Sequence, residues 1–234
     1  MSPRPLDPAT RTTLINVAAR LLAEGGPGAL STRRLAAEAG TSTMAVYTYF
    51  GSMSGLAREI VHDGFARLQQ QFDLVATTAD PVADLTLLGR MYRFSAVANR
   101  HVYGVMFGGP SLAGFALTEE DRQHGRYTLA RVAECAAQCM AAGRLRQDDP
   151  ALFANQLWIA MHGIVTLELG GYLTDPYTAD RCFEAQLTSL LAGAGDQPER
   201  AATSVTVSAR RFAALVTAGR DSEAGFQADH PRAR

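Results

Sequence analysis

Lysine is absent from this 234-residue chain, so all 22 of its basic side chains are arginines. The formal net charge is only −1 at pH 7, and any surface that binds nucleic acid must therefore be local. We attribute the lack of lysine to a GC-rich coding sequence. It still means that cationic contacts to a phosphate must come from arginine or from a helix N-terminus.

Cysteine is scarce as well, with Cys135, Cys139 and Cys182 alone, and three residues give no even-numbered disulfide framework. Cys135 and Cys139 lie four residues apart on one face of a predicted helix. Because no histidine or carboxylate follows at ligand spacing, we interpret them as small buried thiols, with a metal or redox pair as the alternative. We expect no metal and no cofactor.

Long hydrophobic runs are also missing. The N-terminus has no apolar stretch and so does not resemble a signal peptide. The longest apolar segment, residues 151–171, is interrupted by polar side chains that lipid cannot satisfy. We therefore expect a cytoplasmic protein that does not span a membrane. The interrupting residues are Asn155, Gln156, His162, Thr166 and Glu168.

The composition is that of a globular protein, with 47% hydrophobic and 19% charged residues. Nearly every periodic segment has helical spacing, and no strand-turn-strand pattern is found, so the predicted fold class is all-α. Glycine, proline and capping residues separate the segments. Asp7 and Pro8 are expected to open the first helix, Ser31 to cap the second, and Ser42 or Thr41 to cap the third. The expected helices cover residues 8–25, 31–38, 43–50, 54–78, 81–98, 100–107, 118–143, 150–170, 178–192 and 198–218, with a loop at 108–117 and a frayed tail at 219–234.

Residues 31–50 have the pattern of a helix-turn-helix, in which two short helices are joined by a tight turn that contains glycine. Ala36 and Ala39 allow the two helices to cross closely, and Gly40 suits a left-handed turn residue. The second of these helices carries polar and aromatic side chains on its outward face and fits a major groove. These side chains are Thr43, Met44, Tyr47 and Thr48.

The residues from Leu30 to Gly40, then Ser42, the run from Ala45 to Phe50, and Leu56 resemble the N-terminal domain of the tetracycline-repressor (TetR) family. The resemblance covers about residues 8–68 and implies DNA binding. The resemblance implies that Ser31 and Arg33 lie near the DNA backbone, that Tyr47 and Tyr49 bind phosphate, and that Thr43 and Met44 read bases. Independently of it, the helix N-terminus at Ser42 and the outward hydroxyl of Thr48 are candidates for DNA contact. The family usually has lysine where this chain has Met53, which removes one phosphate cation; Arg4, Arg11 and Arg58 are candidates to replace it.

Residues from about 80 onward resemble the C-terminal subclass of this family that is named for a Trp-His-Gly signature, here Trp158, His162 and Gly163. The resemblance implies a helical domain, residues 80–218, that binds a ligand and dimerises. Candidate ligand-pocket residues are Met91, Phe94, Met106, Phe107, Tyr127, Trp158, Met161 and His162. Candidate dimer-interface residues are Ile164, Leu167, Leu187 and Leu190.

Other interpretations remain open. A methionine or aromatic side chain at helical spacing is usually plain core, and a histidine such as His162 is usually a hydrogen-bonded structural residue. We find no nucleophile elbow, phosphate loop or paired carboxylates that would indicate an enzyme. A helical interaction protein of the same fold that has lost DNA binding is the remaining alternative, and Met53 is its main support.

The sequence therefore predicts a transcriptional regulator and not an enzyme. It would be a homodimeric repressor that binds a pseudo-palindromic duplex and is released by a small apolar effector.

Overall fold

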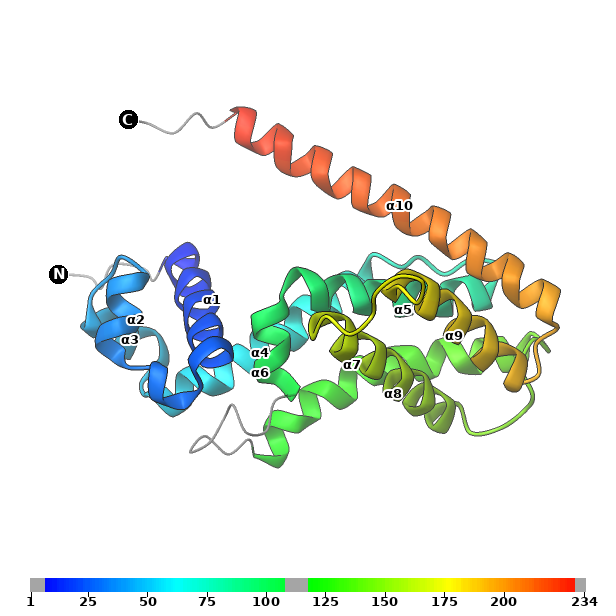
Figure 1. Ribbon diagram of the computed structural model, residues 1–234, viewed down its shortest axis with the longest axis horizontal. Helices are drawn as coiled ribbons and strands as arrows, with labels where there is room; N and C mark the ends of the chain where they lie inside the picture. The colour runs from blue at the N-terminus through cyan, green and yellow to red at the C-terminus, as the bar shows by residue number, and fades with distance from the viewer. Residues whose placement is uncertain (1–6, 108–117, 230–234) are drawn as a thin grey trace. The chain divides into compact units, whose positions relative to one another are not determined.

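The computed structural model describes residues 7–107 and 118–229, and every element within these two ranges is a helix (Figure 1). The all-α fold predicted from the sequence is confirmed. The described residues fall into two compact units, the first within Met1–Gln69 and Ser95–Thr128 and the second within Gln70–Phe94 and Leu129–Arg234. The loop predicted at 108–117 lies outside the described residues. Among the described helices, none has both the length and the apolar character that crossing a membrane requires.

The first unit begins with α1 (Pro8–Gly25), the short 3₁₀ helix η1 (Pro27–Ala29), α2 (Thr32–Glu38) and α3 (Thr43–Phe50). It also contains most of α4 (Met53–Asp73), all of α6 (Arg100–Phe107), and parts of α5 (Pro81–Ala98) and α7 (Glu119–Ala141). Asp7 caps α1 by accepting hydrogen bonds from the backbone N–H groups of Ala9 and Thr10, and Pro8 occupies the first helical position, as the sequence predicted.

One hydrophobic core holds the first unit together. It contains small residues, which let helices approach closely, and branched aliphatic residues, which fill the space between them. Because α1, α2, α3, α4 and α6 all contribute, the position of α3 is fixed by the whole unit. The buried members include Leu14, Ile15, Ala18, Leu22, Leu35, Ala36, Val46, Phe50, Leu56, Ile60, Val102 and Val105.

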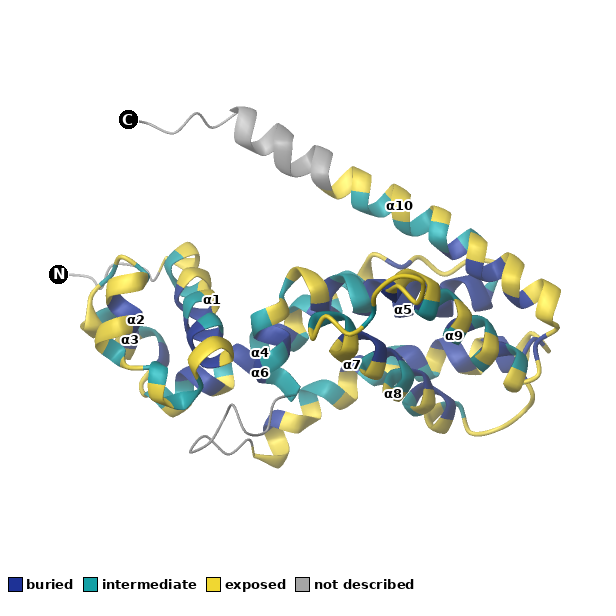
Figure 2. Cartoon of the chain, viewed as in Figure 1, coloured by how far each residue is buried: buried dark blue, intermediate teal, exposed yellow. Residues whose placement is uncertain are grey.

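The second unit contains α8 (Pro150–Leu169), α9 (Ala179–Gly193) and α10 (Pro198–Asp229), together with parts of α5 and α7. Residues 81–92 of α5 are all buried, and α5 is dark blue over much of its length in Figure 2. A helix that is buried all around its circumference lies at the centre of its unit. Met161 of α8 and Phe183 and Leu187 of α9 surround Gly89 of α5.

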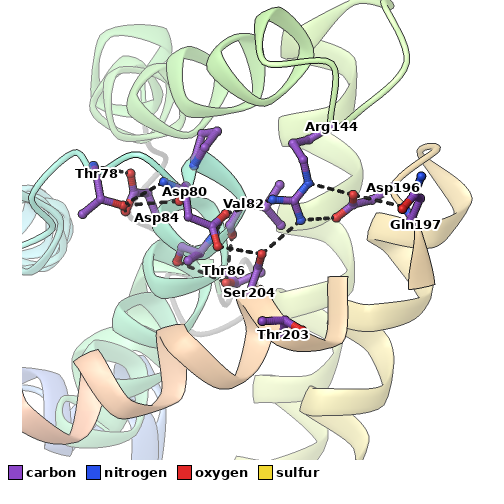
Figure 3. Close-up of polar contacts among 12 residues, drawn as sticks. Thr78, Asp80, Val82, Asp84, Thr86, Arg144, Asp196, Gln197, Thr203 and Ser204 are labelled. Atoms are coloured by element: carbon purple, nitrogen blue, oxygen red, sulfur yellow. Dashed lines mark hydrogen bonds and ion pairs between the residues drawn. The ribbon is translucent and has the colours of Figure 1, made fainter. Parts of the chain in front are cut away.

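A network of hydrogen bonds and ion pairs around Arg144 connects the helices of this unit (Figure 3). The guanidinium donates to both carboxylate oxygens of the buried Asp196, at 2.9 and 2.7 Å, and to Asp80 Oδ1 at 3.1 Å. It also donates to Ser204 Oγ at 3.0 Å, and that hydroxyl donates to Asp80 Oδ2 at 2.8 Å. Residues from the end of α7, the start of α5, the α9–α10 connection and α10 are thereby joined.

Two helix ends differ from the sequence prediction. Helix α4 ends at Asp73 rather than near residue 78, because Thr78 instead donates its backbone N–H and its hydroxyl to the Asp84 carboxylate, at 2.7 and 2.8 Å. Helix α10 continues to Asp229, into the segment that we expected to be a frayed tail. Residues 230–234 lie outside the described residues.

Candidate nucleic-acid interface

The turn between α2 and α3 is closed by backbone hydrogen bonds. Thr41 N–H donates to the Ala36 carbonyl at 2.9 Å, and Ala39 N–H donates to the Leu35 carbonyl at 2.9 Å. Gly40 has φ 64°, and a Cβ atom added there would meet nothing within 4 Å. The requirement for glycine is therefore conformational, because other L-residues rarely adopt this region.

Serine caps both helices of the motif. Ser31 Oγ accepts from Arg34 N–H at 3.3 Å, and Ser42 Oγ accepts from Ala45 N–H at 3.1 Å. The Ser31 cap was predicted, and of the two candidates for the second cap, Ser42 and Thr41, the structure uses Ser42. Each serine oxygen satisfies one of the N–H groups that a helix start leaves without a partner. Both serines remain exposed.

Helix α3 divides into a buried and an exposed face. Val46 and Phe50 enter the core, whereas the four predicted outward residues are exposed. Met44 is the most exposed of the large apolar side chains among them, at 72%. Thr48 Oγ1 donates to the Met44 carbonyl at 2.9 Å. The predicted recognition residues therefore share one accessible surface, which consists of Thr43, Met44, Tyr47 and Thr48.

The two candidate phosphate-binding tyrosines differ from each other. Tyr47 is exposed, and its hydroxyl lies 3.4 Å from Thr32 Oγ1. Tyr49 is partly buried against the core, and its hydroxyl donates to the Asp7 carbonyl at 2.9 Å. Tyr49 thus joins α3 to the N-terminus of α1, a structural role that the sequence did not indicate.

Most arginines of the first unit are already paired with carboxylates. Glu38 accepts from Arg34 Nε at 2.8 Å and also from Arg20, and these hydrogen bonds lower the pKa of the Glu38 carboxyl. Arg11 pairs with Glu59 and Asp63, and Arg58 with Asp121. Within residues 7–69, Arg33 is the one arginine without an ion pair, and it is exposed on α2.

A polar cluster between α4 and α7 was not found from the sequence. His62 Nε2 lies 2.9 Å from Asp121 Oδ1, and the His62 and His124 rings are 4.2 Å apart. Burial by itself raises the pKa of the Asp121 carboxyl. Hydrogen bonds from Thr118 and His62 and the charge of Arg58 outweigh this effect and leave the pKa below its usual value. Residues 59 positions apart form this contact, so no local pattern predicts it.

The eight candidate ligand-pocket residues divide between the two units. Met106, Phe107 and Tyr127 belong to the first unit, where Phe107 packs against Phe65 and Tyr103 and Tyr127 is largely exposed. The other five belong to the second unit. Of these, Met91 and Met161 are buried, and the remaining three are partly buried. Those three are Phe94, Trp158 and His162.

His162 is the polar residue of this second group. Its Nδ1 atom lies 3.4 Å from the Tyr92 hydroxyl, and its ring centroid lies 6.1 Å from that of Trp158. Burial lowers the pKa of the His162 imidazole, so the ring is neutral at neutral pH. A neutral imidazole beside a phenol and an indole offers hydrogen bonds without a charge.

The four candidate interface residues differ in how far they are buried. Ile164 and Leu187 are buried within their own chain. Leu167 is exposed, and Leu190 is partly exposed. Helix α8 also exposes Leu152 and Ile159, the latter at 65%. Neither was predicted from the sequence as an interface residue. A single apolar stripe cannot distinguish core from interface.

The fold and the α2–α3 geometry define a helix-turn-helix protein with an additional helical unit. Two family models match the chain. One, described as bacterial regulatory proteins of the tetR family, matches residues 14–60, and the other, described as the tetracyclin repressor-like C-terminal domain, matches residues 85–190. The chain therefore carries both domains of the tetR family and is a transcriptional regulator of that family. The second model is not that of the Trp-His-Gly subclass.

Solved structures agree with this fold. A protein of unknown function from Rhodococcus sp. RHA1 is 25% identical, with a TM-score of 0.65 over 84% of this chain and 100% of that chain. The TetR family transcriptional regulator PfmR from Thermus thermophilus is 20% identical, with a TM-score of 0.64 over 76% and 97%. NalD of Pseudomonas aeruginosa, the secondary repressor of the MexAB-OprM multidrug efflux pump, is 21% identical, with a TM-score of 0.59 over 79% and 95%. A search of curated proteins finds no match.

Proposed function

We propose that this regulator is a homodimeric repressor of the cytoplasm that binds a pseudo-palindromic operator and is released from it by a small apolar ligand. The observation that carries the proposal is the exposed face of α3, which is held by a serine-capped turn and a buried core. An α-helix of this size fits the major groove of B-DNA. Two copies related by a two-fold axis match two half-sites.

Contacts to phosphate would come from neutral groups and from few cations. Arg33 is exposed and has no ion pair within residues 7–69, and the Tyr47 phenol and the Ser42 hydroxyl are also exposed. Hydroxyl, phenol and backbone N–H groups bind phosphate without net charge. Arg11 and Arg58 are held by carboxylates, so they are poor replacements for the lysine that Met53 displaces.

The dimer would form through the outward faces of α8 and α9. The exposed or partly exposed residues of α8 on this face include Leu152, Gln156, Ile159, Gly163 and Leu167, none of them charged. Those of α9 are small or neutral: Ala185, Gln186, Ser189, Leu190 and Gly193. Uncharged faces rich in small residues suit the close packing of two helices from each subunit.

The ligand would contact the second unit near His162. Tyr92 and Trp158 lie beside this neutral imidazole, and Met91 and Phe94 continue the same α5 segment. Methionine and aromatic side chains suit an apolar molecule with few polar groups. Such a ligand releases DNA only to the extent that it binds better to the conformer that cannot bind the operator.

The proposal is tested by electrophoretic mobility shift on the DNA upstream of the protein's own gene. We expect retardation at low salt, with two protomers per duplex, and its reversal by a subset of small apolar compounds. Arg33→Ala should weaken retardation at every sequence, because it removes a phosphate contact. An absence of affinity for any duplex from a random pool would favour the alternative of a helical interaction protein.

Replacing Met53 with lysine is expected to make operator binding more dependent on salt. Met53 is partly buried beside Thr32, whose hydroxyl lies 3.4 Å from the methionine sulfur. One added phosphate contact steepens the plot of log affinity against log salt by about 0.9, which is about a 3.5-fold larger loss of affinity between 50 and 200 mM salt. A salt titration by fluorescence anisotropy measures this, with Met53→Gln as the uncharged control. Equal slopes for the lysine and glutamine variants would contradict the expectation.

A further inference from the structure

The exposed face of α3 lacks every side chain that reads a base pair through two hydrogen bonds. Arginine and lysine read guanine in this way, asparagine and glutamine read adenine, and carboxylates accept a hydrogen bond from cytosine. Residues 43–50 contain none of these types. What such a face can still recognise in the major groove is the 5-methyl group of thymine, by apolar contact, supplemented by single hydrogen bonds from hydroxyl groups.

The hydroxyl groups around this face are partly engaged within the protein. Thr48 Oγ1 donates to the Met44 carbonyl, Ser42 Oγ accepts from Ala45 N–H, and the Tyr47 hydroxyl lies near Thr32 Oγ1. Met44, by contrast, is 72% exposed. A large, flexible apolar side chain is thereby presented at the second residue of α3, among shorter polar groups.

We propose that Met44 is a specificity-determining residue that packs against the 5-methyl group of a thymine in each operator half-site. The inference rests on the proposed function, because it requires that α3 enters the major groove. It adds what this helix recognises there. Recognition-helix N-termini contact base edges in helix-turn-helix proteins, and Met44 lies in the first turn of α3.

The test compares thymine with deoxyuridine, which lacks only the methyl group. A duplex is first selected from a random pool with the full-length protein, and thymines are then replaced one at a time, symmetrically in both half-sites. Loss of one buried methyl contact weakens binding about fourfold, and loss of two about fifteenfold. Because each replacement removes one methyl group from both half-sites, we expect the loss of about fifteenfold at one thymine position of the half-site. We expect Met44→Ala to bind the thymine and uracil duplexes equally.

Two further variants complete the experiment. Met44→Leu keeps an apolar side chain and should keep the sensitivity to uracil. Val97→Ala, which shortens an exposed apolar side chain on α5, should change neither the affinity nor the sensitivity. Binding that is indifferent to uracil at every position overturns the inference and leaves the proposed function intact. The inference is also overturned if Met44→Ala retains the uracil penalty or loses all binding to both duplexes. Failure to select any duplex overturns the proposed function and the inference together.

Discussion

Replacing Arg144 with methionine is expected to lower the free energy of unfolding by about 3–5 kcal/mol. Asp196 is only 4% exposed. Both of its carboxylate oxygens accept hydrogen bonds from the Arg144 guanidinium (Figure 3). Without the guanidinium, this carboxylate loses its cation, and Asp80 loses its ion pair with the same group. A buried charge left without a partner costs far more than a surface ion pair contributes.

The measurement is urea denaturation followed by circular dichroism at a fixed protomer concentration, because the proposed dimerisation would contribute to apparent stability. Arg146→Met is the matched control. Arg146 is exposed and donates to the Gly193 carbonyl at 2.7 Å, so we expect a change of less than about 1 kcal/mol. The double variant Arg144→Met/Asp196→Leu should recover most of the loss, since a pair replaced by apolar residues is often neutral. A loss below about 1 kcal/mol for Arg144→Met alone would show that water reaches Asp196.

The first unit was largely predictable because its signals are local. The caps at Asp7, Ser31 and Ser42 and the left-handed Gly40 each act within four residues, and each is found where the sequence indicated it. Sequence patterns of this kind report short-range physics. The same local reasoning identified the exposed face of α3. Val46 and Phe50 are four residues apart and therefore share one face of the helix, and the polar residues lie on the other.

Features that depend on distant residues were not predictable. Tyr49 is held by a carbonyl 42 residues away. Residues 203–207 are rich in β-branched side chains, which have a low helix propensity, yet they form part of α10 with Ser204 and Val205 buried. In each case tertiary contacts override the local preference. Apolar periodicity likewise could not tell that Leu187 faces its own core while Leu167 does not.

Replacing Ile159 with arginine is expected to dissociate the proposed homodimer. Ile159 is 65% exposed in the single chain, so the substitution should leave the folding of the protomer intact. In a two-fold interface each change occurs twice on the same surface, and two arginines would meet across the uncharged faces of α8. Like charges brought together at an interface, without water to screen them, oppose association.

Sedimentation velocity should show a shift from dimer to monomer, with an unchanged circular dichroism spectrum. Operator affinity should fall about 100-fold or more, because each half-site then binds independently and loses the effective concentration that linkage provides. Leu74→Arg is the control. It introduces the same charge at a residue that is 52% exposed, in the segment between α4 and α5, and should preserve the dimer.

If Ile159→Arg remains dimeric and binds its operator normally, two-fold association does not use this face of α8. If instead both dimer and affinity are lost while Leu74→Arg retains them, tight operator binding depends on association through α8. The proposed ligand beside His162 would then bind the same helix on which tight operator binding depends.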